Sequence, residues 1–328
     1  MKAFVLRSFG SPDVLELKKV ATPVPADDEV LVRVRATSVQ PFDWHLMRGE
    51  PRVARLMGTL GRRAPKITIL GADMAGQVEA VGRAVKGFRP GDEVYAMLKR
   101  GGGFAEYVCV REGDLAPKPA NLSFEQAAAM PLAACTALLG LRDTGRIQPG
   151  HRVLVNGASG GVGTFAVQIA RSLGARVTGV SGPRNAGLVG SIGADEVVDY
   201  SKEDFTRSGR RYDLLLDVAG SRPARACRRV LTPKGTLAVV GGPAGRWLQP
   251  VGHVFAAVAM SPFVSQTIAM VDVLGCADNG RNLSTLTELA GAGELTPVID
   301  RCYPFEEIPA AVAYQEKGHA SGKVVVTV

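Results

Sequence analysis

The chain has 328 residues, of which 46% are hydrophobic and 21% are charged, and it carries 39 Lys and Arg against 31 Asp and Glu. These proportions exclude a disordered chain, a collagen-like chain and a disulfide-stapled miniprotein, and they fit one or two globular domains. The net charge of +8 accompanies no recognisable nucleic-acid-binding motif, so we expect no nucleic-acid partner.

The first 120 or so residues are predicted to form a small β domain. Strands are expected at 2–6, 14–17, 29–39, 71–82 and 92–97, because β-branched residues alternate there with polar ones between Gly and Pro turns. This pattern is typical of antiparallel pairing.

From about Ser123 the pattern changes to helices that alternate with short, wholly apolar strands. Such strands indicate a parallel sheet that is buried on both faces. We predict strands at 152–156, 176–180, 196–200, 214–218 and 236–240, a sixth at 271–275, and a helix at 162–173. The fold class is therefore α/β with a doubly wound parallel sheet.

The final residues, 323–328, are β-branched and could add a strand to either domain. We expect them to return to the first domain. The predicted organisation is thus 1–122 for the β domain, 123–300 for the nucleotide-binding domain and 301–328 for the returning segment.

The most informative motif is a Gly-rich turn between the first buried strand of the second domain and the following helix. A dinucleotide's diphosphate needs backbone N–H groups and the positive end of a helix close by, which a side chain at Gly160 would obstruct. Gly163 lets the helix pack against the strand. The expected diphosphate-binding residues are Ser159, Gly160, Gly161, Val162 and Gly163.

The end of the second strand indicates which dinucleotide is bound. An acid there would accept the ribose hydroxyls and repel a 2′-phosphate, whereas this chain has Ser181, followed by Arg184 and Asn185. A guanidinium holds phosphate with two parallel hydrogen bonds, so we predict NADPH as the cofactor. The alternatives are that Arg184 is a surface cation and that Tyr200, at the end of the third strand, is a packed tyrosine rather than a cofactor contact.

Across essentially its whole length the chain resembles the medium-chain dehydrogenase/reductases, and specifically their zinc-free quinone oxidoreductase branch. The motifs that carry the resemblance are Ser38-Val39-Gln40-Pro41-Phe42-Asp43-Trp44, Gly71-Ala72-Asp73-Met74-Ala75-Gly76, Pro90-Gly91-Asp92-Glu93-Val94, Gly103-Phe104-Ala105-Glu106-Tyr107, the Gly-rich loop and Gly193-Ala194-Asp195. The resemblance implies a GroES-like first domain, a Rossmann-type second domain and a homodimer.

The resemblance also implies that no metal is bound. The positions of the Cys, His and Cys that hold zinc in metal-dependent relatives match Gln40, Ala72 and Leu132, and residues 96–104 lack the cysteines of a structural zinc loop. Without a Lewis acid, the favoured hydride acceptors are those that spread the incoming negative charge themselves, such as quinones and α,β-unsaturated carbonyls.

Several further site residues follow from the same resemblance. Thr136 matches a position at the nicotinamide end, where the alternative is a helix-interior threonine bonded to its own backbone. Gln40 and Asp43 match catalytic-site positions, although Gln40 replaces the usual asparagine and Asp43 could equally be a turn residue. Two more positions match cofactor contacts: the pair Gly241 and Gly242, and Lys323, which could instead be an exposed strand residue.

The predicted function is hydride transfer from NADPH to a small quinone or enone. Two alternatives stay open: a zinc-free reductase of saturated ketones or biosynthetic intermediates, and an NADPH-binding redox sensor with little turnover. The five cysteines are widely separated and contain no CxxC pair, which together with the lack of a signal-peptide core or membrane span favours the cytoplasm. The apolar stretch 247–270 could line a pocket, cover a dimer interface or rest on a membrane.

Overall fold

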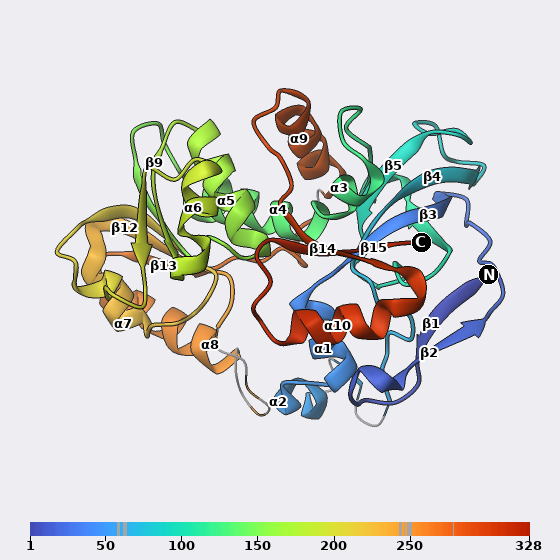
Figure 1. Ribbon diagram of the computed structural model, residues 1–328, viewed down its shortest axis with the longest axis horizontal. Coiled ribbons are helices and arrows are strands. Elements are labelled where there is room, and N and C mark those ends of the chain that lie inside the picture. The colour runs from blue at the N-terminus through green and yellow to red at the C-terminus, as the bar shows by residue number, and fades with distance from the viewer. Residues whose placement is uncertain (58–59, 62–63, 243–244, 246, 248–250, 278) are drawn as a thin grey trace. The chain divides into compact units, whose positions relative to one another are not determined.

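The structure is a computed structural model that describes residues 1–328 except 58–59, 62–63, 243–244, 246, 248–250 and 278. The chain divides into two compact units (Figure 1): unit 1 comprises Met1–Cys135 and Cys276–Val328, and unit 2 comprises Thr136–Gly275. This division differs from the predicted boundaries after residues 122 and 300. Residues 123–135 and 276–300 join unit 1 because α3 (Phe124–Ala128) packs against β3 and β4, and α9 (Asn279–Gly291) packs against β7 and β5.

Unit 1 is built on a seven-stranded, largely antiparallel sheet. Its order is β14-β15-β3-β4-β5-β7, with β6 also paired to β3, and a separate hairpin pairs β1 with β2. The last strand, β15, pairs antiparallel with β3, so the carboxyl-terminal segment returns to this unit. The strands are β1 (Lys2–Leu6), β2 (Leu15–Lys19), β3 (Glu29–Val39), β4 (Asp73–Val81), β5 (Glu93–Met97), β6 (Tyr107–Arg111), β7 (Leu115–Pro117), β14 (Ile299–Pro304) and β15 (Lys323–Thr327).

Two hydrophobic clusters stabilise unit 1. One contains Val30, Val32 and Val34, which alternate along β3 and point to the same face of the sheet. The other lies where β15 and the helices α1 (Pro41–Arg48) and α10 (Ile308–Glu316) meet, and Met47 and Ile308 are fully buried in it. α2 (Arg52–Leu56) is a short exposed helix after α1.

Unit 2 contains a six-stranded parallel sheet in the order β10-β9-β8-β11-β12-β13. Numbered along the chain, this is the order 3-2-1-4-5-6 of a doubly wound dinucleotide-binding sheet, which confirms the predicted fold class. The strands are β8 (Arg152–Asn156), β9 (Arg176–Ser181), β10 (Glu196–Asp199), β11 (Tyr212–Asp217), β12 (Leu231–Val239) and β13 (Thr267–Met270), and the helices are α4 (Pro131–Leu138, which begins in unit 1), α5 (Gly161–Ser172), α6 (Ala186–Ser191), α7 (Ala224–Cys227) and α8 (Val251–Ala259).

Strands of unit 2 have leucines on their central residues, and Leu154, Leu215 and Leu237 are 0–1% exposed in one continuous core. Burial on both faces explains why these strands are apolar throughout rather than alternating. The five strands predicted from 152 to 240 each overlap one of β8 to β12, and the largest difference is at the start of β12, which begins five residues before the predicted strand.

The predicted sixth strand at 271–275 is wrong, since β13 occupies Thr267–Met270. Met270 pairs with Val239, the last residue of β12, so the ladder has no partner strand beyond this point. A turn follows instead, in which the backbone N–H of Gly275 donates to Asp272 at 2.8 Å.

The apolar stretch 247–270 contributes α8 and β13, and residues 248–250 of it lie outside the described residues. Phe255 on α8 is 69% exposed. No helix within the described part of the chain is long and apolar enough to cross a membrane.

Candidate functional site

Unit 2 holds a candidate site in a crevice at the carboxyl edge of its parallel sheet. The strand order reverses between β8 and β11, and in open α/β sheets ligands bind at such a switch point. Asn156 ends β8 and Asp217 ends β11, and their side chains are hydrogen-bonded at 2.7 Å. The crevice opens beside this pair.

Two glycines of the loop between β8 and α5 are present for different reasons. A Cβ at Gly163 would lie 2.0 Å from the carbonyl oxygen of Gly157, so the helix packs against the loop only without a side chain there. A Cβ at Gly160 would approach the protein no closer than 3.6 Å, and its backbone is in the extended region. The fold therefore requires Gly163 but does not require Gly160.

The amino terminus of α5 faces this loop. Gly160 is the N-cap residue and offers no side-chain oxygen to the first turn, whose N–H groups have no partner within an α-helix. Gly161, Val162 and Gly163 form that turn. Such N–H groups, with the positive end of the helix dipole, suit a phosphate group.

A pocket of about 190 Å³ continues from the loop along the sheet edge. Three of the predicted residues line it: Ser159, Ser181 and Tyr200. Tyr200 is 61% exposed, so it is not a packed strand-end residue. The sequence missed the remaining polar lining, which is Asn156, Glu203, Ser221 and Arg222.

Arg184 and Asn185 lie in a short 3₁₀ turn just beyond the end of β9. Asn185 donates from Nδ2 to the hydroxyl of Ser159 at 3.2 Å, which ties this turn to the Gly-rich loop. Arg184 is exposed and does not line the pocket. Arg222 does line it, and its guanidinium is paired with Asp204 at 3.3 Å.

Gly241 and Gly242 follow β12, at the same edge of the sheet. A Cβ at Gly220 would lie 2.3 Å from the Cα of Gly242, so the turns after β11 and β12 are in direct backbone contact. A Cβ at Gly241 would lie 2.9 Å from the carbonyl oxygen of Val218. Backbone without side chains thus lines this part of the edge.

Unit 1 holds a separate buried polar cluster, where β3 ends and β4 and β15 begin. Ser38 of β3 is paired with Asp73, the first residue of β4. Val39 is paired with Val324, which brings Gln40 beside Lys323 at the start of β15. Gln40 and Lys323, which are 283 positions apart in the sequence, therefore lie side by side.

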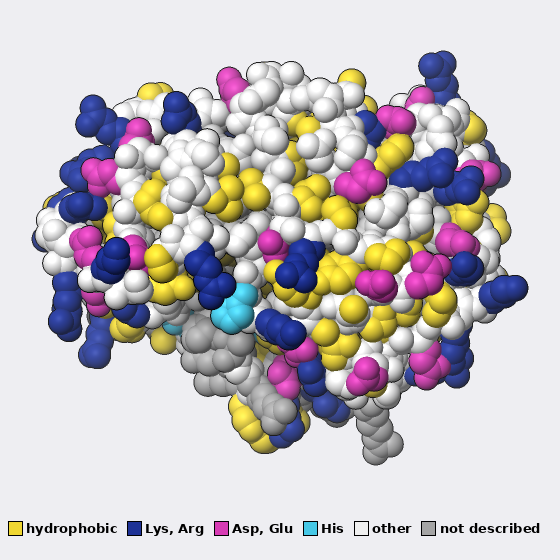
Figure 2. Space-filling model, viewed as in Figure 1, with side chains coloured by type: hydrophobic (Ala, Val, Ile, Leu, Met, Phe, Trp, Pro, Cys, Tyr) yellow, Lys and Arg dark blue, Asp and Glu magenta, His cyan; other side chains and the backbone are white. Residues whose placement is uncertain are grey.

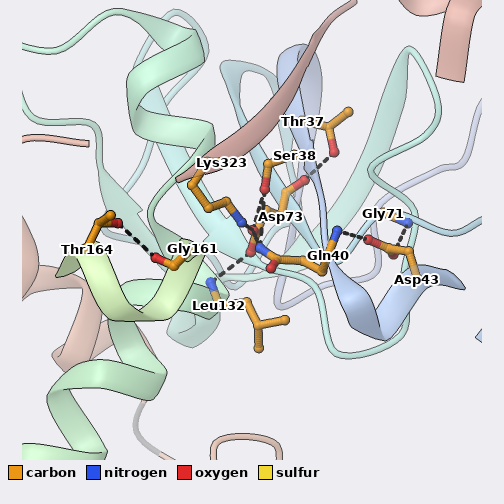
Figure 3. Close-up of polar contacts among 10 residues, drawn as sticks. All are labelled: Thr37, Ser38, Gln40, Asp43, Gly71, Asp73, Leu132, Gly161, Thr164 and Lys323. Carbon is orange, nitrogen blue, oxygen red and sulfur yellow. Dashed lines mark hydrogen bonds and ion pairs between the residues drawn. The ribbon is translucent and has the colours of Figure 1, made fainter. Parts of the chain in front are cut away.

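Asp73 lies at the centre of this cluster (Figure 3). Its Oδ2 accepts hydrogen bonds from the hydroxyl of Ser38 at 2.6 Å and from the side-chain amide of Gln40. Its Oδ1 accepts from the backbone N–H of Leu132 at 2.8 Å. The sequence analysis did not select Asp73, although it lies inside one of the quoted motifs.

Lys323 is 2% exposed, which shows that the exposed-strand alternative is wrong. Its Nζ forms an ion pair with Asp73 at 3.6 Å and, among the described residues, has no hydrogen-bond partner. Burial lowers the pKa of Lys323, and the nearby carboxylates of Asp73 and Asp43 oppose that shift. A buried ammonium with unused N–H groups is suited to hold an anionic ligand.

Asp43 lies in the first turn of α1 and is 1% exposed. One of its oxygens accepts from the backbone N–H of Gln40 at 2.8 Å, and the other accepts from that of Gly71 at 2.9 Å. Burial raises the pKa of Asp43 to about 7 against the lowering effect of these hydrogen bonds. The geometry favours the turn role, in which Asp43 fixes the start of α1 and thereby Gln40.

The residues present do not fit a catalytic zinc ion. The side chains of Ala72 and Leu132 have no donor atom, and the amide nitrogen of Gln40 is bound to Asp73. In the part of the chain that the structure describes, no group of three or more His, Cys, Asp or Glu is arranged to hold a metal. Thr136 is buried within α4.

Comparisons with known proteins agree with this architecture. Residues 26–120 match the family model described as an alcohol dehydrogenase GroES-like domain. Residues 192–326 match the model described as a zinc-binding dehydrogenase.

Relatives are similar over nearly the whole chain. The chloroplast envelope quinone oxidoreductase homolog of Arabidopsis thaliana is 33% identical, covering 99% of this chain and 98% of its own. The NADPH-dependent alkenal/one oxidoreductase of the same plant is 32% identical, covering 99% and 79%. The solved structure of the quinone oxidoreductase from Coxiella burnetii is 29% identical, with a TM-score of 0.85 over 100% and 99% of the two chains.

Proposed function

Because the chain belongs to the medium-chain dehydrogenase/reductase superfamily, in its quinone oxidoreductase-like branch, we propose that it is an NADPH-dependent, zinc-free reductase of quinones or α,β-unsaturated carbonyls. The chain is an oxidoreductase with an NAD(P)-binding fold. The proposal specifies the cofactor, the metal-free chemistry and the substrate class.

The loop between β8 and α5 carries this proposal. The fold does not require glycine at residue 160, because a Cβ there would lie no closer than 3.6 Å to any other atom. Gly160 nevertheless lies at the amino end of α5, whose first N–H groups have no capping side chain. A diphosphate that approaches these N–H groups explains the glycine. Ser159, Gly161, Val162 and Gly163 complete the proposed diphosphate contacts.

The adenosine end is assigned to the pocket beside the loop. Ser181 and Tyr200 line it, and neither carries a negative charge that would repel a 2′-phosphate. Arg184 and Asn185 belong to the turn after β9, which Asn185 ties to Ser159 of the Gly-rich loop. Glu203 and Arg222 line the same pocket, and Arg222 is already paired with Asp204, so the 2′-phosphate is assigned to the exposed Arg184 beyond the lining.

The nicotinamide end is assigned to Gly241 and Gly242, which have no side chains at this edge of the sheet, and to Thr136. Lys323 is assigned to the cofactor's phosphate, because its buried ammonium forms only one ion pair, at 3.6 Å, within the described residues. When bound, the cofactor supplies a hydride. The chain's own groups then position the acceptor.

Gln40 is the proposed hydrogen-bond donor to the acceptor's oxygen. The hydroxyl of Ser38 and the carboxylate of Asp73 both accept from its Nε2, and Asp43 fixes its backbone through a 2.8 Å hydrogen bond. A neutral amide stabilises negative charge less than a metal ion does, so acceptors whose conjugation spreads that charge are favoured. Asp43 acts here by positioning Gln40.

The test is NADPH consumption with 1,4-benzoquinone, cyclohex-2-enone and cyclohexanone, together with NADP⁺ reduction by cyclohexanol, with the products identified. We expect turnover of the quinone and the enone only, unchanged after dialysis against a chelator. Turnover of the saturated ketone supports the ketone-reductase alternative, to which the amide of Gln40 is also suited. Tight NADPH binding without turnover supports the sensor, and turnover of the alcohol that returns with zinc contradicts the proposal.

We also propose a homodimer in the cytoplasm. β13 is an edge strand of the parallel sheet and therefore has one side available for pairing with a second copy. None of the five cysteines forms a disulfide with another cysteine, which suits a reducing compartment. Sedimentation of the purified protein tests the dimer.

A further inference from the structure

A second pocket of unit 2 lies at the opposite edge of the parallel sheet from the Gly-rich loop. It has a volume of about 370 Å³ and is lined by residues at the amino ends of three neighbouring strands. Because parallel strands begin at one edge and end at the other, this pocket is separated from the cofactor crevice by the length of the strands. Its lining consists of Arg211 before β11, Arg228, Arg229, Leu231 and Pro233 at β12, and Ser265 and Gln266 before β13.

The segment that supplies most of this lining is strongly basic. Residues 207–234 contain eight Lys or Arg and only two acids, Asp213 and Asp217. Figure 2 shows Lys and Arg side chains along the left margin of the molecule, the side on which Figure 1 places α7 and β12. The segment therefore carries a formal excess of six positive charges.

Neither acid of the segment neutralises the pocket. Asp213 accepts hydrogen bonds from the backbone N–H of Arg152 at 3.0 Å and from the hydroxyl of Thr232 at 3.4 Å. Asp217 is 1% exposed at the other end of β11, where it is bonded to Asn156. Both carboxylates are thus occupied within the sheet.

Two arginines of the segment are ion-paired, Arg210 with Glu196 at 3.0 Å and Arg222 with Asp204 at 3.3 Å. The three arginines of the pocket form no ion pair with any residue that the structure describes; they are Arg211, Arg228 and Arg229. Arg207, Arg225 and Lys234 also have no ion pair among the described residues, but they lie outside the pocket lining. The pocket is therefore the place where three cations without a counter-ion gather.

The geometry of the pocket fits a small ligand. Arg211 donates from Nη1 to the carbonyl oxygen of Arg229, which holds its guanidinium over the start of β12. Leu231 and Pro233 form an apolar wall. The buried Oε1 of Gln266 has no hydrogen-bond partner among the described residues, but as an acceptor it offers no donor to an anion, so the guanidinium groups carry the recognition.

We propose that this pocket binds a small phosphorylated or polycarboxylate metabolite that carries at least two negative charges. Like charges gathered without a counter-ion repel one another, and a multivalent anion removes that repulsion. Guanidinium groups hold phosphate and carboxylate oxygens with paired hydrogen bonds. The volume lies at the small end of the range of roughly 300–1,000 Å³ that is usual for ligand pockets.

Calorimetric titration with inorganic pyrophosphate tests the proposal, with NADPH present to occupy the cofactor crevice and with ionic strength held constant. We expect one site per chain, with weaker binding of orthophosphate and none of acetate. Arg228→Gln should weaken pyrophosphate binding by roughly 10- to 100-fold, the effect of one charge-assisted contact. The affinity for NADPH should not change.

Arg225→Gln is the matched control. Arg225 is exposed on α7, three residues from Arg228, and is outside the pocket lining, so both variants remove the same charge from the same segment. If the two variants lose the same affinity for pyrophosphate, the attraction is only diffuse charge and the proposal is overturned. Unchanged pyrophosphate binding in R228Q overturns it as well. If R228Q does not fold, Arg211→Gln at the exposed rim takes its place with the same expected result.

Discussion

Gly160 and Gly163 of the Gly-rich loop test the cofactor assignment. A methyl group added at Gly160 should weaken cofactor binding, whereas one added at Gly163 should lower the stability of the fold. Gly160→Ala places a Cβ 3.6 Å from the nearest protein atom, which is ordinary contact. Gly163→Ala places one 2.0 Å from the carbonyl oxygen of Gly157 and 2.8 Å from the backbone of Ala158. Only the second collides with backbone that has no freedom to move.

The expected free energies follow from these distances. Gly160 has φ −82° and ψ 177°, which alanine adopts without strain. The loss of unfolded-state entropy stabilises the variant by roughly 0.4–1 kcal/mol, and alanine's poorer capping costs about as much. The stability of G160A should therefore change by less than about 0.5 kcal/mol. G163A should lose roughly 1–3 kcal/mol or more, as in overpacked cores.

Affinity for NADPH should follow the opposite order. A methyl group at residue 160 keeps a diphosphate from the N–H groups at the start of α5, so we expect a loss of about 10- to 100-fold, or roughly 1.4–2.7 kcal/mol. Urea denaturation gives the stability, and quenching of intrinsic fluorescence gives the dissociation constant. If G160A is stable and binds NADPH within twofold of the parent, the diphosphate is not held at this loop and the assignment is wrong.

Four other predictions follow from the remaining site residues. Arg184→Ala should raise the Michaelis constant for NADPH about tenfold, the effect of one charge-assisted contact, and leave that for NADH unchanged; equal effects contradict its assignment to the 2′-phosphate. Thr136→Val should slow hydride transfer in single-turnover kinetics more than it weakens cofactor binding, and an unchanged rate removes it from the site. Lys323→Met should cost roughly 3–5 kcal/mol in urea denaturation because it leaves Asp73 buried without its cation, and adding Asp73→Asn should recover part of this loss. Asp43 has a folded pKa of about 7 against 3.8 for an ordinary aspartate, so the folded state binds the extra proton and stability should fall as pH rises from about 4 to about 7; Asp43→Asn should flatten that slope in a pH series of denaturation curves.

The parallel sheet and the phosphate loop were predictable because their signals are local. The strand 152–156 was located to the residue, and α5 begins one residue before the predicted helix. A buried strand, a Gly-rich turn and a helix each have a characteristic pattern of consecutive residue types. Gly163 was assigned to helix packing, and the 2.0 Å clash confirms that reason.

Features that depend on pairing between distant segments were harder to predict. The sixth strand was placed at 271–275 because that run is apolar, but the position of β13 is set by where β12 ends, at Val239. Arg222 was missed for a related reason: it follows β11 in sequence, and only the neighbouring β8 and β9 show that this strand end borders the pocket.

The cluster around Asp73 is the clearest case. Lys323 was left open as an exposed strand residue because lysine is almost never fully buried unless it is paired, and its partner is 250 residues away. Only the ladders of β15 with β3 and of β3 with β4 bring the ammonium and the carboxylate together. No local pattern contains that information.

The same cluster explains how an aspartate and a lysine are tolerated beside a second buried acid. Asp73 and Lys323 neutralise one another, whereas Asp43 has only backbone N–H partners, and burial holds its pKa near 7. Below that pH the three groups together carry no net charge, which is the least costly state for a buried cluster. A ligand phosphate that drew Lys323 away from Asp73 would leave the carboxylate with the hydroxyl of Ser38 and the amide of Gln40. Gln40 and Lys323 therefore share one carboxylate, that of Asp73.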